Sequence, residues 1–318
     1  MRILWLTIDR TNRVASHIFA GLQQAVGAIA TVDFAVRTLD MEAGAFCKQV
    51  VMGGRVIPPV LNPDAVNDYD LIFTDAIFGF MSERWQDIKV PKAILMEDQH
   101  GPMVRKYMES AYYDFQFDIF CVRYRDATKK FHPYLYGKPV IWLPHSIPCD
   151  IFKDYGREKS IDCLSTGMNS SKFYPMRAKV DDELCSSGFY KRIERPPENR
   201  LQDRWPAGKD YAQLLNASRI AIACTSRFRY PVIKIFEIPA CATALCSDYI
   251  PELDDLGFVP GENMIEMKPE DDIKKVIKEW LTAQELDRLT QNGRSLILER
   301  HTNETRAKEF IAQMGSCI

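Results

Sequence analysis

The sequence has no cysteine pair at the C-x-x-C spacing, no run of about 20 apolar residues and no strong net charge. Its nine cysteines are scattered along 318 residues, which favours reduced thiols in the protein core over a disulfide framework or a zinc site. The absence of a long apolar run argues against a membrane span, and the opening stretch MRILWLTIDR is too short for a secretory leader. A net charge of −2 supplies no general attraction to nucleic acid. We therefore expect a cytoplasmic protein without a membrane span.

Motifs of several common enzyme classes are also missing. The loop TIDRTNR after the first apolar run carries no G-x-G-x-x-G, which argues against a dinucleotide-dependent oxidoreductase. The sequence has no H-E-x-x-H and no G-x-S-x-G motif. Asp68-Tyr69-Asp70 has the form of a metal-binding D-x-D, but it directly precedes the apolar run LIFTD and has no supporting ligands. We interpret it as the polar start of a strand and expect no metal site.

Short apolar runs alternate with helical patterns along the whole chain. Examples are ILWLTI, TVDFAV, KAILMED and FDIFCV in the first half and IDCLST, SRIAIAC and TALCSD in the second. This alternation predicts βαβ units and parallel sheets flanked by helices. The pattern lapses around LPHSIPCDIFKDYGREKS, and a chain of this length is sufficient for two domains. We expect an α/β protein of two Rossmann-like domains, 1–147 and 148–301, with 302–318 as a terminal helix that packs back on the first domain.

The stretch from Tyr211 to Asp248 carries the strongest functional signal. SRIAIAC reads as a buried strand, and we expect a helix to begin at Pro231 after the Arg-rich loop TSRFRYP. Ligands of open α/β sheets bind beyond the carboxyl ends of the strands, where helix N-termini favour phosphate. Four charged side chains are predicted at that end, with Lys234 and Glu237 on the more polar side of the helix: Arg227, Arg229, Lys234 and Glu237.

Several segments follow one another in a fixed order: VIWLPHSIPCDIF, IDCLSTG, the Tyr174-Pro175-x-Arg177 element, YAQLLNASRIAIAC, FEIPACATALCSD and HTNETR. Together they resemble bacterial glycosyltransferases of the GT-B fold, in the branch that includes the CgeB-like spore-maturation proteins. The resemblance covers residues 70 to 310 and is best in the second half. The resemblance implies two domains that face each other across a cleft and a transfer of sugar from a nucleotide diphosphate, with a uridine diphosphate sugar as the expected donor.

The resemblance also implies roles for individual residues. Glu237 matches a helix glutamate that contacts the ribose hydroxyls in related retaining enzymes, and a carboxylate suits a cis-diol. Arg177 belongs to the matching Tyr-Pro element, and Gly167 ends a strand where its backbone allows close approach of the donor. Two positions depart from the family, because Arg229 stands where many members have Glu and Ala242 where they have Gly. Arg227, Arg229 and Lys234 are then expected to hold the diphosphate without a metal.

The first domain is expected to supply the acceptor side. In MEDQHGP, at the end of a predicted strand, Asp98 and His100 are candidates for proton transfer or substrate orientation, and His145 and residues 9–13 are further candidates. The expected reaction is metal-independent and retaining, with no cofactor beyond the nucleotide-sugar co-substrate. The acceptor is a hydroxyl of a glycan, a protein or a small molecule.

Three other interpretations stay open. The basic clusters RYRDATKK and YKRIERPPENR could line a phosphate groove, as in phage-type glucosyltransferases that act on 5-hydroxymethylated bases of DNA. The departures at Arg229 and Ala242 would also fit a non-catalytic protein of the same fold in spore or envelope assembly. A dehydrogenase is the least favoured, since fold alone does not fix function.

Overall fold

The computed structural model describes residues 1–8, 16–37, 50–52, 55–57, 63–75, 85–194 and 206–318. The chain divides into two compact units. The first consists of Met1–Ser16, Leu22–Pro144 and Arg306–Ile318, and the second of His17–Gly21 and His145–Thr305.

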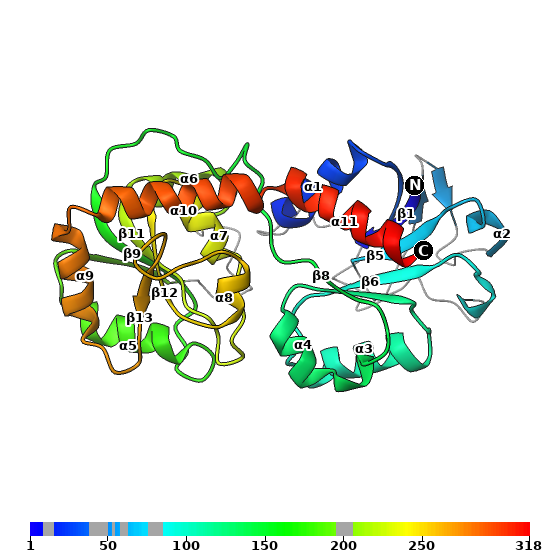
Figure 1. The fold of residues 1–318 in the computed structure, drawn as a ribbon, viewed down its shortest axis with the longest axis horizontal. Helices are drawn as coiled ribbons and strands as arrows, with labels where there is room; N and C mark the ends of the chain where they lie inside the picture. The colour runs from blue at the N-terminus through cyan, green and yellow to red at the C-terminus, as the bar shows by residue number, and fades with distance from the viewer. Residues whose placement is uncertain (9–15, 38–49, 53–54, 58–62, 76–84, 195–205) are drawn as a thin grey trace. The chain divides into compact units, whose positions relative to one another are not determined.

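The first unit is built on an eight-stranded sheet with the order β4-β3-β2-β1-β5-β6-β7-β8 (Figure 1). Neighbouring strands pair in parallel except for the hairpin β3–β4 and its pairing with β2, which are antiparallel. The strands are β1 (Arg2–Ile8), β2 (Thr31–Arg37), β3 (Val50–Met52), β4 (Arg55–Ile57), β5 (Leu71–Thr74), β6 (Lys92–Met96), β7 (Ile119–Val122) and β8 (Val140–Trp142). The short hairpin has no counterpart among the apolar runs identified in the sequence.

Helices cover both faces of this sheet. They are α1 (Ser16–Gly27), α2 (Pro63–Val66), α3 (Pro102–Tyr113), α4 (Arg125–Phe131) and α11 (Asn303–Cys317), with short 3₁₀ turns at Trp85–Asp87 and Pro133–Leu135. Successive strand residues point to opposite faces, so Leu4 packs in the same core as Met108 of α3. On the other face Trp5 and Phe73 contact Phe310 of α11, with ring centroids 5.9 and 4.8 Å away. The last helix thus completes the first unit (Figure 1).

The second unit is a parallel five-stranded sheet with the order β10-β9-β11-β12-β13. Its strands are β9 (Ile161–Gly167), β10 (Tyr190–Glu194), β11 (Ser218–Ile222), β12 (Ala244–Asp248) and β13 (Ile265–Met267). Its helices are α5 (Pro175–Leu184), α6 (Gly208–Asn216), α7 (Lys234–Ala240), α8 (Glu252–Asp255), α9 (Ile273–Thr282) and α10 (Leu286–Arg300). Two α/β units with mainly parallel sheets confirm the predicted fold class.

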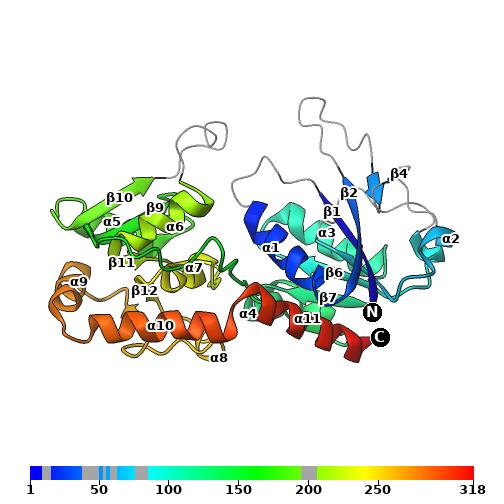
Figure 2. The ribbon, with the colours of Figure 1, turned by 90° about the horizontal axis from the view of Figure 1, so that it is seen from above.

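The two faces of the second sheet are covered by different helices. Val180 of α5 and Ile277 of α9 pack with the strand residues Cys163 and Ile222 in one buried cluster. The helices α6, α7 and α10 lie on the opposite face, as Figure 2 shows from above. The chain runs from β9 outward to β10 and then returns to β11 on the other side of β9. The carboxyl ends of β9 and β11 therefore flank the topological switch point, where open α/β sheets bind ligands.

Candidate functional site

Lys234 reaches from the start of α7 to the carboxyl end of β9. Its ammonium donates to the backbone oxygen of Thr166 at 2.7 Å and to Thr166 Oγ1 at 2.8 Å. The strand then ends at Gly167, whose φ of +118° is a backbone conformation that residues with a side chain rarely adopt. A Cβ built there would lie 2.9 Å from Lys234 Nζ and 3.0 Å from Arg177 Nη1. Glycine is thus needed both for its backbone angle and for the approach of two cations.

Two buried or half-buried arginines complete this basic cluster. Arg177 donates from Nη1 to Met168 O at 2.9 Å, and its guanidinium lies 4.1 Å from the centre of the Tyr174 ring. Arg192, at the end of β10, donates from Nη2 to Gly167 O at 2.6 Å and pairs through Nε with Asp181 Oδ2 at 2.8 Å. We define Lys234, Arg177 and Arg192 as the cation cluster. It gathers at the switch point around the carboxyl end of β9.

The cation cluster alters the acidity of its own lysine. Burial is the main cause that lowers the pKa of Lys234, and the positive charge of Arg177 lowers it further. Glu237 acts in the opposite direction. A lysine in this setting gains strongly from a nearby anion, because the anion offsets both the burial and the repulsion.

Glu237 lies one turn after Lys234 and is buried, with 4% of its surface exposed. Its charge acts on Lys234, so this more polar side of the helix is turned into the protein at Glu237 rather than toward solvent. The helix itself begins at Lys234 rather than at Pro231. Tyr211 is a close neighbour, since burial and then the charge of Glu237 raise the pKa of its hydroxyl. That hydroxyl lies 3.2 Å from Thr166 Oγ1, near the end of β9.

Arg227 and Arg229 occupy the exposed loop between β11 and α7. Arg227 donates its backbone N–H to Phe173 O at 2.8 Å, and its guanidinium lies 5.1 Å from the ring centre of Phe228. Arg229 has a φ of +59°, and Ala242 has a φ of +52°. Both positions where the sequence departs from the family are therefore in left-handed backbone, a conformation that L-residues other than Gly and Asn adopt at a cost.

Asp248 is a site residue that sequence reasoning did not single out. Its carboxylate accepts hydrogen bonds from the backbone N–H of Thr225, at 2.8 Å, and from the Thr225 hydroxyl. These bonds tie the carboxyl end of β12 to that of β11. Burial raises the pKa of Asp248, while the bonds from Thr225 oppose the rise. Its position as the last residue of the predicted strand TALCSD was the available signal.

Two histidines that the sequence made conspicuous belong to an aromatic cluster of the second unit. The ring of His301 lies parallel to that of Phe258, with centroids 6.1 Å apart, and its Nε2 is 2.8 Å from Leu256 O. His145 lies 6.3 Å from the ring of Phe236, the residue next to Glu237. These contacts give both rings a packing role beneath α7.

The acceptor-side candidates of the first unit follow β6. Asp98 as a whole residue is exposed. Partial burial of its carboxyl group by the surrounding protein raises the pKa of Asp98, and the positive charge of His100 opposes this rise. The backbone oxygen of His100 accepts from Arg105 Nη2 at 3.5 Å. Glu97, one residue earlier, pairs with the buried Arg123 at 3.5 Å. The structure places Asp98 and His100 at the carboxyl end of a central strand, and residues 9–13 lie outside the described residues.

Another group of polar side chains lies at the switch point of the first sheet, between β1 and β5. Asp75, only 8% exposed, accepts from Trp5 Nε1 at 2.9 Å and from Thr7 Oγ1 at 2.8 Å. Gln23 of α1 adds a third bond at 3.0 Å. This network fixes the ends of both strands.

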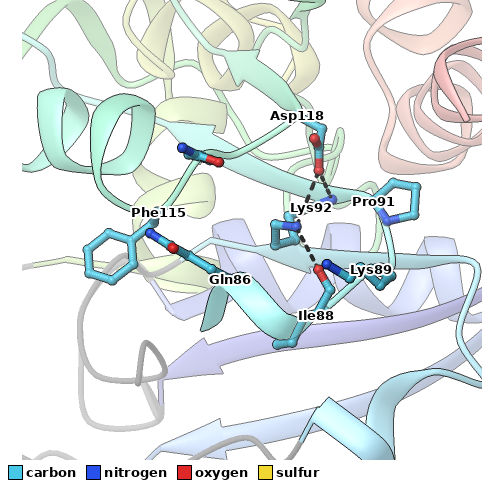
Figure 3. Close-up of a pocket in the computed structure, with 8 residues that line it drawn as sticks. Gln86, Ile88, Lys89, Pro91, Lys92, Phe115 and Asp118 are labelled. Carbon is cyan, nitrogen blue, oxygen red and sulfur yellow. Dashed lines mark hydrogen bonds and ion pairs between the residues drawn. The ribbon is translucent and has the colours of Figure 1, made fainter. Parts of the chain in front are cut away.

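A hollow with a volume of about 300 Å³ lies at the opposite end of that sheet, before β6 (Figure 3). One of its two lysines is already engaged, because Lys92 Nζ donates to Ile88 O at 3.2 Å and lies 3.6 Å from Asp118 Oδ2. Ligands of open α/β sheets bind at the carboxyl ends. We interpret this hollow as structural.

Within the described residues, no group of three or more histidine, cysteine or acidic side chains is arranged to hold a metal ion. The same residues include no helix that is both long and apolar enough to cross a membrane.

Comparisons with known proteins agree with this geometry. Residues 177–312 match the family model described as glycosyl transferase-like. No curated protein matches the sequence significantly. Among solved structures, HepE of Anabaena in complex with UDP and glucose is similar with a TM-score of 0.64 and 11% identity, over 99% of this chain and 100% of that one. Sucrose-phosphate synthase from Thermosynechococcus elongatus is similar with a TM-score of 0.60 and 13% identity, over the whole of both chains.

A third solved structure is longer than this chain. The pneumococcal O-GlcNAc transferase GtfA in complex with UDP and GlcNAc is similar with a TM-score of 0.53 and 8% identity, over 78% of this chain and 56% of that one. The chain has the GT-B fold, and its residues 177–312 are similar to the glycosyl transferase-like family. The cation cluster and Glu237 lie in this unit, and all but the end of β9 lies within the matched residues.

Proposed function

We propose that the protein is a glycosyltransferase that moves a sugar from a uridine diphosphate donor to an acceptor hydroxyl. The observation that carries the proposal is the cation cluster at the switch point of the second sheet. Lys234, Arg177 and Arg192 meet around the carboxyl end of β9, and only Gly167 leaves room for them. A diphosphate is the part of such a donor that this cluster suits.

In the proposed reaction the bond between the anomeric carbon and the diphosphate oxygen breaks, and a bond to the acceptor oxygen forms. Negative charge grows on the departing diphosphate, and the cations of Lys234 and Arg177 stabilise it more in the transition state than in the bound donor. The lowered pKa of Lys234 fits this role, because a bound anion raises that pKa again and so brings the ammonium to full charge. Basic side chains thereby replace a metal ion.

Glu237 and the exposed arginines have separate proposed roles. The Glu237 carboxylate accepts hydrogen bonds from the two ribose hydroxyls, which its burial strengthens. Arg227 and Arg229 draw the diphosphate toward the loop. HepE was solved with UDP and with UDP-glucose, which supports uridine as the base.

The proposal assigns the acceptor to the first unit. Asp98 and His100 are the candidates to take up the proton that the acceptor hydroxyl releases. The raised pKa of Asp98 brings this carboxylate closer to the strength that a general base needs. Retention of the anomeric configuration is the outcome that the family resemblance favours.

The decisive experiment measures donor binding and turnover separately. UDP and UDP-glucose should raise the apparent melting temperature, because a ligand that binds only the folded state stabilises it. Glu237→Gln should weaken UDP binding by about tenfold or more, since a hydrogen bond to a charged group contributes roughly 1.5–3 kcal/mol. Release of UDP from the sugar nucleotide should continue in EDTA.

Lys278→Met is the matched control for Lys234→Met, because Lys278 is an exposed lysine of α9 in the same unit. We expect Lys234→Met to lower affinity for UDP by about tenfold and the control to leave it unchanged. Equal affinity in both variants, or turnover that stops in EDTA and returns with magnesium, would contradict the proposed donor site.

A further inference from the structure

A cavity of about 590 Å³ lies within the first unit, between α4, the turn that follows it and strand β8. This volume is in the range of sites for small molecules. All its lining residues fall between Val122 and Trp142, so it shares none with the cation cluster of the second unit. β8 is the last strand of its sheet order, and Arg125 of α4 contacts Trp142 of β8.

The cavity is basic. Arg125, Lys129 and Lys138 line it, and its lining includes no carboxylate. One neighbouring carboxylate, Asp126, accepts from Arg125 Nε at 3.0 Å and from Lys129 Nζ at 3.4 Å through the same oxygen. Two of the three lining cations thus lie beside the same carboxylate oxygen. The potential in the cavity favours an anion.

The cavity also has apolar and aromatic surfaces next to its cations. The guanidinium of Arg125 lies 4.6 Å from the centre of the Trp142 ring. Tyr136 lines the same cavity and is 96% exposed, an unusual position for so large a ring. Leu135 supplies a buried apolar wall. A ligand that fits must offer a ring or another apolar body beside its negative group.

We propose that this cavity is a second binding site, for a small molecule that carries a phosphate, sulfonate or carboxylate group on a ring. The anionic group pairs with Lys129 and Lys138, and the ring packs against Trp142 and Tyr136. The site is independent of the proposed donor site and does not rest on glycosyltransferase activity.

The probe for the test is 8-anilinonaphthalene-1-sulfonate, which joins a ring system to one anion and fluoresces when it binds. The full chain should bind it with one-to-one stoichiometry, and excitation of Trp142 should sensitise its emission. Lys138→Glu should weaken binding by about tenfold, because it puts a negative charge beside the sulfonate. Lys129→Gln should weaken it less, and Trp142→Phe should remove most of the sensitised emission.

Lys278→Glu is the control, since it makes the same charge change at an exposed position of the other unit. Thermal unfolding of each variant distinguishes a lost site from a lost fold. Benzoate and inorganic phosphate should compete with the probe, benzoate more strongly, and the uncharged analogue 1-anilinonaphthalene should bind more weakly.

Three results would overturn the proposal. Probe affinity that is equal in Lys138→Glu and Lys278→Glu would show that the cavity does not hold the anion. Complete displacement of the probe by UDP would assign the binding to the donor site. Displacement by a short DNA duplex with a steep salt dependence, but not by benzoate, would make this surface a nucleic-acid groove instead.

Discussion

Gly167 shows how one residue controls the candidate donor site. Its left-handed backbone would strain any other residue, and its missing side chain is the space that Lys234 and Arg177 occupy. Gly156 also has a positive φ, of +64°, but a Cβ there would meet nothing within 4 Å. The two glycines thus differ in crowding as well as in backbone angle.

We expect Gly167→Ala to destabilise the protein by more than Gly156→Ala. The Gly156 variant should cost about 1–2 kcal/mol, the strain of left-handed backbone alone. The Gly167 variant should cost more, because its Cβ displaces two cations, and should also weaken UDP binding. Urea unfolding and UDP titration of both variants check this, and equal losses would contradict the crowding.

Replacement of Ala242 by glycine, the residue that the family has at this position, should stabilise the protein. Ala242→Gly relieves left-handed strain at φ +52°, and the greater freedom of Gly in the unfolded chain offsets part of that gain. We expect an increase of about 0.5 kcal/mol in the free energy of unfolding. Ala312→Gly, on the exposed side of α11, should have the opposite sign, with a loss of about 0.5–1 kcal/mol. A lower free energy of unfolding for Ala242→Gly would contradict the predicted backbone strain at this position.

At the scale of elements, the end of α4 carries a histidine that cannot easily ionise. His132 is 1% exposed and lies 2.7 Å from Tyr134 Oη through Nδ1. Burial lowers the pKa of His132 to about 4, and the positive charge of Arg105 lowers it further, while the Gln99 backbone opposes the change. The folded unit therefore keeps the His132 imidazole neutral at pH values well below about 6.5, the usual pKa of histidine.

This histidine should make stability depend on pH. Its pKa is lower in the folded state, so the unfolded state takes up the proton first, and its contribution is present above pH 6.5 and is lost as pH falls toward 4. The loss should be up to about 3 kcal/mol. Urea unfolding between pH 7 and 4 should show a shallower decline for His132→Asn than for the parent. Parallel curves would contradict this assignment.

At the same scale, the sequence predicted some elements better than others. The runs ILWLTI and SRIAIAC became β1 and β11 because buried parallel strands have a continuous apolar signature. The hairpin β3–β4 was missed, since its stability comes from pairing with β2 rather than from a pattern of its own. The start of α7 was placed too early, because Pro231 permits a helix start without requiring one.

At the scale of the whole molecule, the chain returns to its first unit at the end. The link segments lie together, since Ile147 donates to His301 O at 2.9 Å and Asn303 donates to Ile147 O at 3.1 Å. Ser146 Oγ also donates to Asn303 Oδ1 at 2.7 Å. From there α11 runs into the core of the first unit, where Phe310 is fully buried.

Phe310→Ala should therefore destabilise the first unit rather than the second unit, although the second unit directly precedes α11 in the sequence. We expect a loss of about 3–5 kcal/mol from the cavity beside Trp5 and Phe73. Leu298→Ala, at a position 39% exposed on α10, is the control and should cost far less. Hydrogen exchange resolved by segment should show faster exchange in β1 and β5, and faster exchange confined to residues 145–305 would contradict the prediction.

The sequence by itself determined the two-unit α/β fold and the region of the candidate donor site. Apolar runs, turn residues and the order of family-like segments are local features, and local features can be recognised directly in the sequence. Only the tertiary structure decided which side chains meet. Arg192, from a strand far along the chain, completes the cation cluster with Lys234 and Arg177, and Glu237 is buried rather than exposed. Such contacts depend on the order of strands in the sheet, which brings together residues that no spacing in the sequence connects.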